Sequence, residues 1–217
     1  MLKNDFKKEA KVQYEKCNAL ENGTPAKQYK IAKCLLEKGG YFVTKNRSMA
    51  IKLFKKAADN GHVEAAFETY VMSFFKNKND TYGLKYLKFA AEKGHERAQL
   101  DLARYYMNKK VTVYKDLYDP EKSFEILKNL VKKTKNTQAY ILMGRSYETG
   151  KGTEIDLEKA LKYYKKVNTH ERFFLTTKDI HRVEMLMNDP TTKTLEEIAK
   201  NNPNIYKFAN GKLKVIL

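Results

Sequence analysis

Tryptophan, cysteine and proline are scarce in this sequence of 217 residues, which contains no tryptophan, two cysteines and four prolines. With ten glycines and four prolines, the composition excludes a collagen-like chain and a low-complexity disordered chain. No run of 18 apolar residues occurs, so we expect no transmembrane helix. The sequence has no Cys-x-x-Cys and no His-x-x-x-His spacing, so it predicts no metal site.

The motifs of common enzyme classes are missing as well. There is no Gly-x-Ser-x-Gly nucleophile elbow and no zinc-protease helix. Gly150-x-Gly152 lacks the third glycine of a dinucleotide fingerprint and the Lys-Ser/Thr pair of a P-loop, so we interpret it as a turn between two helices. The sequence therefore predicts a protein that is not an enzyme and that binds no cofactor.

The first residues read Met-Leu-Lys-Asn-Asp-Phe-Lys-Lys-Glu and contain neither an apolar core nor a small-residue cleavage site. A secretory signal peptide needs both features. We therefore expect no signal peptide and a cytoplasmic location.

What the sequence does contain is an internal repeat. The segment Ala-Ile-Lys-Leu-Phe-Lys-Lys-Ala-Ala-Asp-Asn-Gly-His, which begins at Ala50, nearly recurs from Gly83 as Gly-Leu-Lys-Tyr-Leu-Lys-Phe-Ala-Ala-Glu-Lys-Gly-His. Shorter copies begin at Ser123 and Ala160. Apolar residues at positions i, i+3, i+4 and i+7 predict that each copy is an amphipathic helix. Recurrence every few tens of residues is typical of proteins built from stacked repeats.

A second predicted helix precedes each of these copies. Its apolar face recurs as Ala98, Leu102, Ala103 and Tyr106, then as Ala139, Met143, Gly144 and Tyr147, with looser copies from Lys27 and Ala65. The small residue in the third position lets a neighbouring helix approach closely. Each repeat is therefore predicted to be a helical hairpin, helix A followed by helix B, which cannot bury its apolar face alone.

A Gly-His pair recurs between helix B and the next helix A, as Gly61-His62 and Gly94-His95. A glycine after a helix can adopt the left-handed conformation that ends it at little steric cost. The histidine stands at the same position of both repeats, which indicates local capping of the next helix rather than catalysis. Asp156 is predicted to cap the last helix B in the same manner.

The best copy, from Ala139 to Tyr164, resembles the Sel-1-like repeat family of the tetratricopeptide superfamily. The family pattern pairs Leu-Gly-x-x-Tyr with a Gly-x-Gly loop, Asp-x-x-Lys-Ala and two aromatic residues. The matching residues are Met143-Gly144, Tyr147, Gly150, Gly152, Asp156, Lys159-Ala160 and Tyr163-Tyr164. The resemblance covers roughly residues 12–167, but the Gly-x-Gly loop is intact only once. Secreted members carry a Cys pair in each repeat, and the lack of such pairs here favours a reducing compartment.

Periodicity and resemblance together predict an all-α, right-handed α-α solenoid superhelix of about four Sel-1-like, TPR-like helical hairpins with a divergent C-terminal cap. We expect the solenoid over residues 1–167, with a capping helix at 1–22. Its four repeats are expected at about residues 24–61, 62–94, 95–134 and 136–168. Residues 168–217 should form the helical cap and end in a β-hairpin, because Asn210-Gly211 between β-prone flanks is the strongest short hairpin signal.

The resemblance implies a non-enzymatic protein–protein interaction scaffold or adaptor that binds a peptide or protein in the concave groove of the repeats. In tetratricopeptide proteins this groove is lined by helix A residues that project away from the packing seam. The corresponding residues are Tyr29, Lys33, Phe67, Val71, Phe74, Leu100, Arg104, Met107, Ile141 and Arg145. Arg104 and Arg145 would suit an acidic or carboxylate-bearing partner. The alternative is that the apolar members pack against neighbouring A helices.

Positive charge predominates, with 43 Lys and Arg against 26 Asp and Glu and a net charge of +17. Such a charge attracts phosphate backbones, anionic lipid or acidic protein. The alternative function is therefore a basic module that binds nucleic acid or another polyanion non-specifically. The lysines are spread along every helix B, which is typical of a solvated surface, whereas one stripe of Lys and Arg on the concave face would favour nucleic acid.

Overall fold

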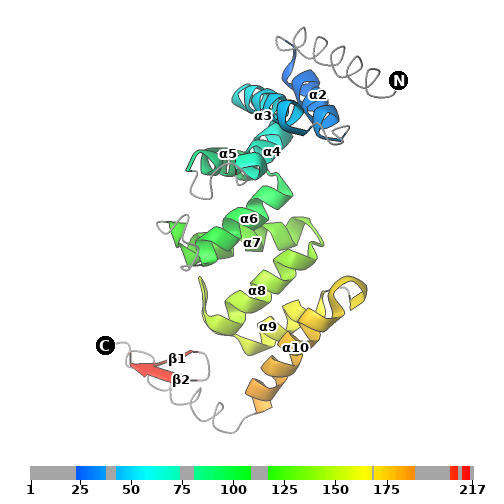
Figure 1. The fold of residues 1–217 in the computed structure, drawn as a ribbon. Helices are drawn as coiled ribbons and strands as arrows, with labels where there is room; N and C mark the ends of the chain where they lie inside the picture. The colour runs from blue at the N-terminus through cyan, green and yellow to red at the C-terminus, as the bar shows by residue number, and fades with distance from the viewer. Residues whose placement is uncertain are drawn as a thin grey trace. The chain divides into compact units, whose positions relative to one another are not determined.

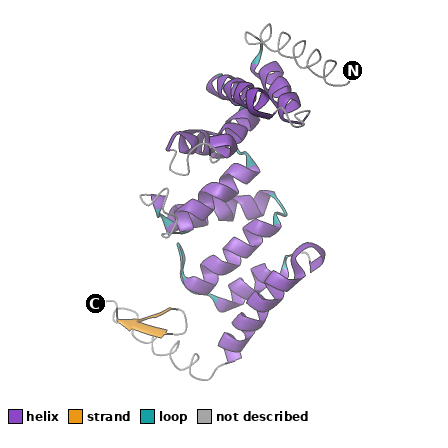
Figure 2. Cartoon of the chain, viewed as in Figure 1, coloured by secondary structure: helices purple, strands orange, loops and turns teal. Residues whose placement is uncertain are grey.

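The structure is a computed structural model that describes residues 23–37, 43–73, 81–108, 117–167, 169–188, 206–209 and 212–215. Within these residues it consists of successive α-helices and one two-stranded sheet (Figures 1 and 2). The chain divides into two compact units, Met1–Ala98 and Gln99–Leu217. None of the described helices is both long enough and apolar enough to cross a membrane.

The first unit is built from successive antiparallel helices. It contains α2 (Pro25–Glu37), α3 (Val43–Asp59), α4 (Val63–Ser73), α5 (Thr81–Glu92) and the start of α6 (Glu96–Met107). Helix α2 packs on α3, α3 on α4 and α4 on α5. The apolar face predicted from Ala50 onward is buried, with Leu53, Phe54 and Ala57 almost fully covered. Helices α4 and α5 approach closely at Gly83, where an added Cβ would overlap the hydroxyl of Ser73.

The second unit continues the same pattern. It contains the rest of α6, α7 (Pro120–Lys133), α8 (Thr137–Thr149), α9 (Leu157–Lys165), α10 (Thr169–Asn188), β1 (Tyr206–Ala209) and β2 (Lys212–Val215). Leu127, Leu130 and Met143 belong to a core that α6, α7 and α8 share. A second core joins α8, α9 and α10. The buried hydroxyl of Ser123 donates a hydrogen bond of 2.7 Å to the Ala103 carbonyl and ties α7 to α6.

The predicted helical hairpins are confirmed. Helices α2, α4, α6 and α8 stand at the predicted A positions, and α3, α5, α7 and α9 at the B positions. The predicted capping helix at residues 1–22 lies outside the described residues. The predicted β-hairpin is present, because β1 pairs antiparallel with β2 and Ala209 stands opposite Lys212.

Two small residues allow α8 and α9 to pack closely. Ala160 is fully buried. Gly144 lies under the ring of Tyr164, and an added Cβ would overlap three atoms of that ring. The small residue that the sequence places in the third position of the helix A face is therefore required by the contact between these two helices.

Among the residues that the structure describes, four glycines adopt the left-handed conformation, and their surroundings differ. Gly61 and Gly94 both have φ = 87°, and an added Cβ would meet no atom at either position. They end α3 and α5 as predicted, with the backbone N–H of the following histidine bonded to Ala57 and Ala90 respectively. Gly152 has φ = 73°, and an added Cβ there would overlap the Pro120 carbonyl at the start of α7.

This contrast yields a prediction for two alanine substitutions. Gly94→Ala should lower the free energy of unfolding by about 1 kcal/mol, because only the left-handed backbone disfavours a Cβ. Gly152→Ala should cost about 2–3 kcal/mol, because the Cβ also displaces the backbone of α7. Urea unfolding followed by circular dichroism measures both. Equal decreases in the free energy of unfolding of the two variants would contradict the close approach of Gly152 to the Pro120 carbonyl.

Candidate functional site

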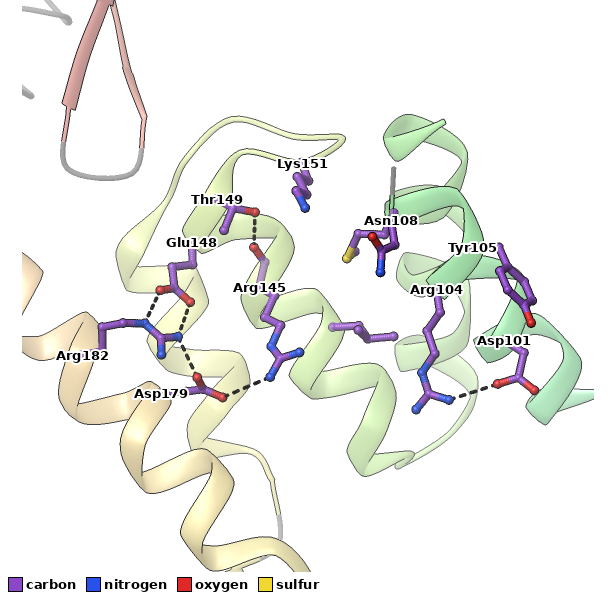
Figure 3. A pocket seen from close by; sticks show the side chains of 12 residues that line it. Asp101, Arg104, Tyr105, Asn108, Arg145, Glu148, Thr149, Lys151, Asp179 and Arg182 are labelled. Carbon is purple, nitrogen blue, oxygen red and sulfur yellow. Dashed lines mark hydrogen bonds and ion pairs between the residues drawn. The ribbon is translucent and has the colours of Figure 1, made fainter. Parts of the chain in front are cut away.

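The second unit carries an open pocket of about 870 Å³. Its walls come from α6, α8, α10 and the loop that follows α8 (Figure 3). The lining residues are Asp101, Arg104, Tyr105, Met107, Asn108, Leu142, Arg145, Glu148, Thr149, Lys151, Asp179 and Arg182.

Helical spacing places the polar lining residues on one face of each helix. On α8, Arg145 and Glu148 are three residues apart, and the opposite face carries the buried residues Ala139 and Met143. The helix is fixed at both ends: the Asn136 side chain accepts from the Ala139 N–H, and Gly150 ends the helix at φ = 67°. The next residue, Lys151, is the middle residue of the Gly-x-Gly loop and lines the pocket.

A network of hydrogen bonds joins α8, α9 and α10 along one side of the pocket. The Arg182 guanidinium donates from Nε to Glu148 Oε1 at 2.6 Å and from Nη2 to Glu148 Oε2 at 2.8 Å. Tyr164 donates its hydroxyl to Glu148 Oε2 at 2.7 Å. Arg182 Nη2 also donates to Asp179 Oδ1 at 2.7 Å. The Glu148 side chain, only 10% exposed, thus accepts three hydrogen bonds in all.

The network holds its members in fixed charge states. Burial raises the pKa of Glu148, but the hydrogen bonds from Arg182 and Tyr164 and the nearby guanidinium charges lower it by more, so its pKa lies below the ordinary value. Burial, followed by the hydrogen bond to Glu148, raises the pKa of Tyr164. The hydrogen bond to Glu148 also raises the pKa of Arg182. At neutral pH, Glu148 is therefore a carboxylate and Tyr164 a neutral donor.

Arg145 is held far less tightly than Arg182. Its Nη2 lies 3.9 Å from Asp179 Oδ2, a distance too long for a hydrogen bond, and 51% of its side chain is exposed. Arg104 donates to Asp101 at 3.0 Å and to Gln138 at 2.7 Å, and 44% of its side chain is exposed. Figure 3 shows Arg104 and Arg145 on two different walls of the pocket.

The pocket offers ion pairing and hydrogen bonding to a ligand. Its lining contains four cationic side chains and three carboxylates. Two of the carboxylates, Glu148 and Asp179, are bound by Arg182. The Thr149 hydroxyl donates to the Arg145 carbonyl at 2.7 Å. Among the described residues of the whole chain, no group of three His, Cys, Asp or Glu side chains could hold a metal ion.

Five of the predicted groove residues lie in the second unit. Arg104, Met107 and Arg145 all line the pocket. Leu100, Met107 and Ile141 are buried, at 6–7% exposure, in the cores of the unit. These three apolar residues thus contribute to helix packing, while the two arginines remain accessible, and neither the groove nor packing against A helices alone is decided by their burial.

The other five predicted residues lie in the first unit. Tyr29 stacks on His62 with ring centroids 4.7 Å apart, and the buried Phe67 stacks on His95 at 4.3 Å. Lys33 Nζ lies 3.9 Å from Glu68 Oε1. Val71 is half-buried, and Phe74 lies outside the described residues. That all ten residues bind one partner stays a prediction.

Sequence reasoning missed the members of the network that α10 supplies. Asp179 and Arg182 have no counterpart in another repeat, so the repeat alignment could not single them out. The available signal was their i, i+3 spacing beside the apolar residues Ile180 and Val183, which predicts a polar edge next to a buried helical face. Lys151 was missed because the Gly-x-Gly loop was interpreted only as a turn.

Comparisons with known proteins agree on one family. The Sel1 repeat profile matches residues 28–62, 74–95 and 137–166. A solved structure of a protective antigen of uropathogenic Escherichia coli, which displays an SLR fold, is similar with a TM-score of 0.62 and 23% identity over 82% of this chain. A Sel1 repeat protein from Oxalobacter formigenes is similar with a TM-score of 0.57 and 25% identity over 69% of this chain. The chain spans 37% and 60% of the lengths of these two proteins. No curated protein gives a significant match.

Replacing Glu148 tests the energetic role of the network. Glu148→Gln keeps the shape but removes the charge that Arg182 binds, so the free energy of unfolding should fall by about 2 kcal/mol. The control is Glu125→Gln, because Glu125 is 61% exposed in its pair with Lys128 and its loss should cost less than about 0.5 kcal/mol.

The difference in free energy of unfolding between wild type and Glu148→Gln should depend on pH in a definite direction. Since the pKa of folded Glu148 lies below the ordinary value of 4.5, its contribution is present above that pH and is lost as the pH falls below it. The free energies of unfolding of wild type and Glu148→Gln should therefore become more similar as the pH falls below 4.5. A gap that is absent at pH 7, or that widens below pH 4.5, would contradict the proposed charge state.

Proposed function

Because three segments of this chain match the Sel1 repeat, and proteins with this repeat generally serve as protein–protein interaction scaffolds, we propose that it is a non-enzymatic adaptor that binds a peptide segment of another protein. The scarcity of cysteine, with two in 217 residues and Cys34 exposed as a free thiol, supports a reducing compartment such as the cytoplasm.

The observation that carries this proposal is the pocket between α6, α8 and α10. It is an open cleft large enough for several side chains of an extended peptide, and its floor includes the apolar residues Met107 and Leu142. Arginine beside buried apolar residues is a common source of binding energy at protein interfaces.

The charges that remain available in the pocket favour an acidic segment. Arg182 is engaged by two carboxylates, so it offers little to a ligand. Arg145 has no hydrogen bond within the described residues that would be lost when its guanidinium turns to a carboxylate, and Lys151 is exposed at the rim. A guanidinium binds a carboxylate through two parallel hydrogen bonds. We therefore propose that Arg104, Arg145 and Lys151 bind Asp or Glu side chains, or a chain terminus, of the partner.

The first unit can supply further contacts. Tyr29, Lys33 and Val71 are half-buried, and each retains exposed surface. Phe67 of the first unit is buried, as are Leu100, Met107 and Ile141 of the second, and each would support the surface of its own unit from beneath. The proposal thus keeps nine of the ten predicted residues and gives them different roles, while Phe74 lies outside the described residues.

Charge reversal tests the pocket. A peptide-display selection on the wild-type protein should enrich segments that contain Asp and Glu. Arg104→Glu with Arg145→Glu should weaken the binding of a selected peptide at least tenfold, because two attractive ion pairs become repulsive. Fluorescence anisotropy gives the Kd, and the melting temperature should stay near that of wild type.

The matched control reverses two charges elsewhere in the same unit. Lys132→Glu with Lys133→Glu lies at the exposed end of α7, outside the pocket. It changes the net charge by the same amount and should leave the Kd within about twofold. Equal weakening in both variants would show that overall charge decides binding, and no weakening in the folded pocket variant would place the partner elsewhere.

The second candidate function is non-specific polyanion binding, which the net charge of +17 favours. Binding of single-stranded and double-stranded oligonucleotides should then be weak, independent of sequence, and should fall steeply with the logarithm of salt concentration. Filter binding at salt concentrations from roughly 50 to 200 mM, a range over which counterion release changes affinity strongly, gives the slope of log K against log salt concentration. Sequence-selective binding that persists at high salt would contradict this expectation.

A further inference from the structure

The N-termini of α4 and α6 share a capping arrangement that differs from the described caps of α7, α8 and α9. In each, an imidazole accepts a hydrogen bond from the third backbone N–H of the helix. In each, an aromatic ring from the preceding helix A stacks on that imidazole. The arrangement follows a left-handed glycine, Gly61 or Gly94, that ends the preceding helix B.

The hydrogen bond that caps each helix requires one protonation state of its histidine. Nδ1 of His62 accepts from the Ala65 N–H at 3.2 Å, and Nδ1 of His95 accepts from the Ala98 N–H at 3.2 Å. Only a neutral imidazole with its proton on Nε2 can accept at Nδ1, because both nitrogens of an imidazolium are donors. Protonation therefore removes the cap and also places a positive charge at the positive end of the helix dipole.

The described caps of the second unit are of a different kind. Helix α7 is capped by Asp119, α8 by Asn136 and α9 by Asp156, each through the same third N–H of the helix. Asparagine does not titrate, and hydrogen bonds with Lys122 and Lys159 hold the pKa values of Asp119 and Asp156 below the ordinary value even though burial opposes the shift. These caps persist at a pH at which imidazole is protonated.

From this contrast we propose that His62 and His95 form a paired proton-sensitive switch, which orders the first turns of α4 and α6 at neutral pH and releases them in mild acid while the caps of the second unit stay in place. The switch acts through the first turns of α4 and α6, which lie within the first unit. It does not depend on the pocket or on the nature of its ligand.

The groups around each histidine decide how strongly it responds. Glu64 and Glu68 of α4 and Glu96 of α6 favour protonated His95, whereas burial and the charge of Arg97 disfavour it. Burial is the largest of these effects, and the pKa of His95 is lowered. Arg97 also lies over the Phe67 ring, 5.6 Å from its centroid, on the aromatic partner of His95.

His62 has a nearer acidic neighbour. Glu64 Oε2 lies 3.4 Å from Nδ1 of His62, and Tyr29 of α2 covers its ring.

The sign of the pH dependence follows from linkage. The pKa of folded His95 lies below the ordinary value of 6.5, so the unfolded first turn takes up a proton first. The stabilisation by this cap is complete above pH 6.5 and is lost as the pH falls from there through the folded pKa. The aspartate caps of the second unit respond only near or below their ordinary pKa of 3.8.

Backbone amide exchange in the full chain reports the switch at single residues. The N–H groups of Ala65 and Ala98 are the donors to the two histidines, and the N–H of Ala139, which donates to Asn136, is the internal control. After correction for intrinsic exchange, protection at Ala98 should fall by roughly fivefold between pH 7.5 and pH 4.5 relative to Ala139, the effect of one lost cap. Protection at Ala65 reports the cap at His62 in the same way.

The matched variant replaces both histidines by the residue that α8 uses. His62→Asn with His95→Asn should retain protection at pH 7.5 and should show no acid-induced loss relative to Ala139. Nitrogen-15 spectra of labelled wild-type histidine supply a readout without any substitution, since both rings should carry the proton on Nε2 at pH 7.5. The proposal is overturned if wild-type protection at Ala98 follows that at Ala139, if the double variant keeps the acid response, or if the rings carry the proton on Nδ1.

Discussion

Tyr164 occupies the position on which both the packing and the pocket of the second unit depend. Its ring is fully buried and fills the space over Gly144, where no Cβ could fit. Its hydroxyl reaches Glu148, which in turn binds Arg182 of α10. One side chain of helix B thus sets the distance between α8 and α9 and orients the carboxylate that holds α10. The wall of the pocket follows from a packing constraint between two neighbouring helices.

The parts of the structure that were predictable are those that short-range chemistry determines. The helical hairpins follow from apolar spacing, the ends of α3 and α5 from Gly61 and Gly94, and the β-hairpin from Asn210-Gly211. The pocket was less predictable, because one of its walls comes from α10. This helix lies outside the repeats, so a repeat alignment could not identify Asp179 and Arg182 as lining residues. The outward projection of Leu100 and Ile141 was inferred from their own helices. Their burial depends on neighbouring helices, which the spacing within one helix does not describe.

The repeat position before helix A illustrates how a solenoid can vary its chemistry without changing its geometry. Histidine at positions 62 and 95 and Asn136 all accept a hydrogen bond from the same backbone N–H. The geometry of the cap requires only an acceptor within reach of that N–H. The acceptor's pKa is free to differ, so neighbouring repeats with the same backbone can respond differently to acid. The stacked rings of Tyr29 and Phe67 occur only where the acceptor is an imidazole, which adds apolar contact to the hydrogen bond.

The net charge of the chain does not predict the charges that line the pocket. The whole chain carries +17, yet the pocket contains three carboxylates beside its four cations. Because Glu148 and Asp179 both bind Arg182, the strongest internal ion pairs involve a guanidinium whose Nε and Nη2 donors are already engaged. Arg145 Nη2 lies 3.9 Å from Asp179 Oδ2, too far for a hydrogen bond, so the guanidinium N–H groups of Arg145 remain available to a ligand. The selectivity of such a surface therefore depends on which cations the protein's own carboxylates leave unoccupied, and the positions of those carboxylates are set by helix packing.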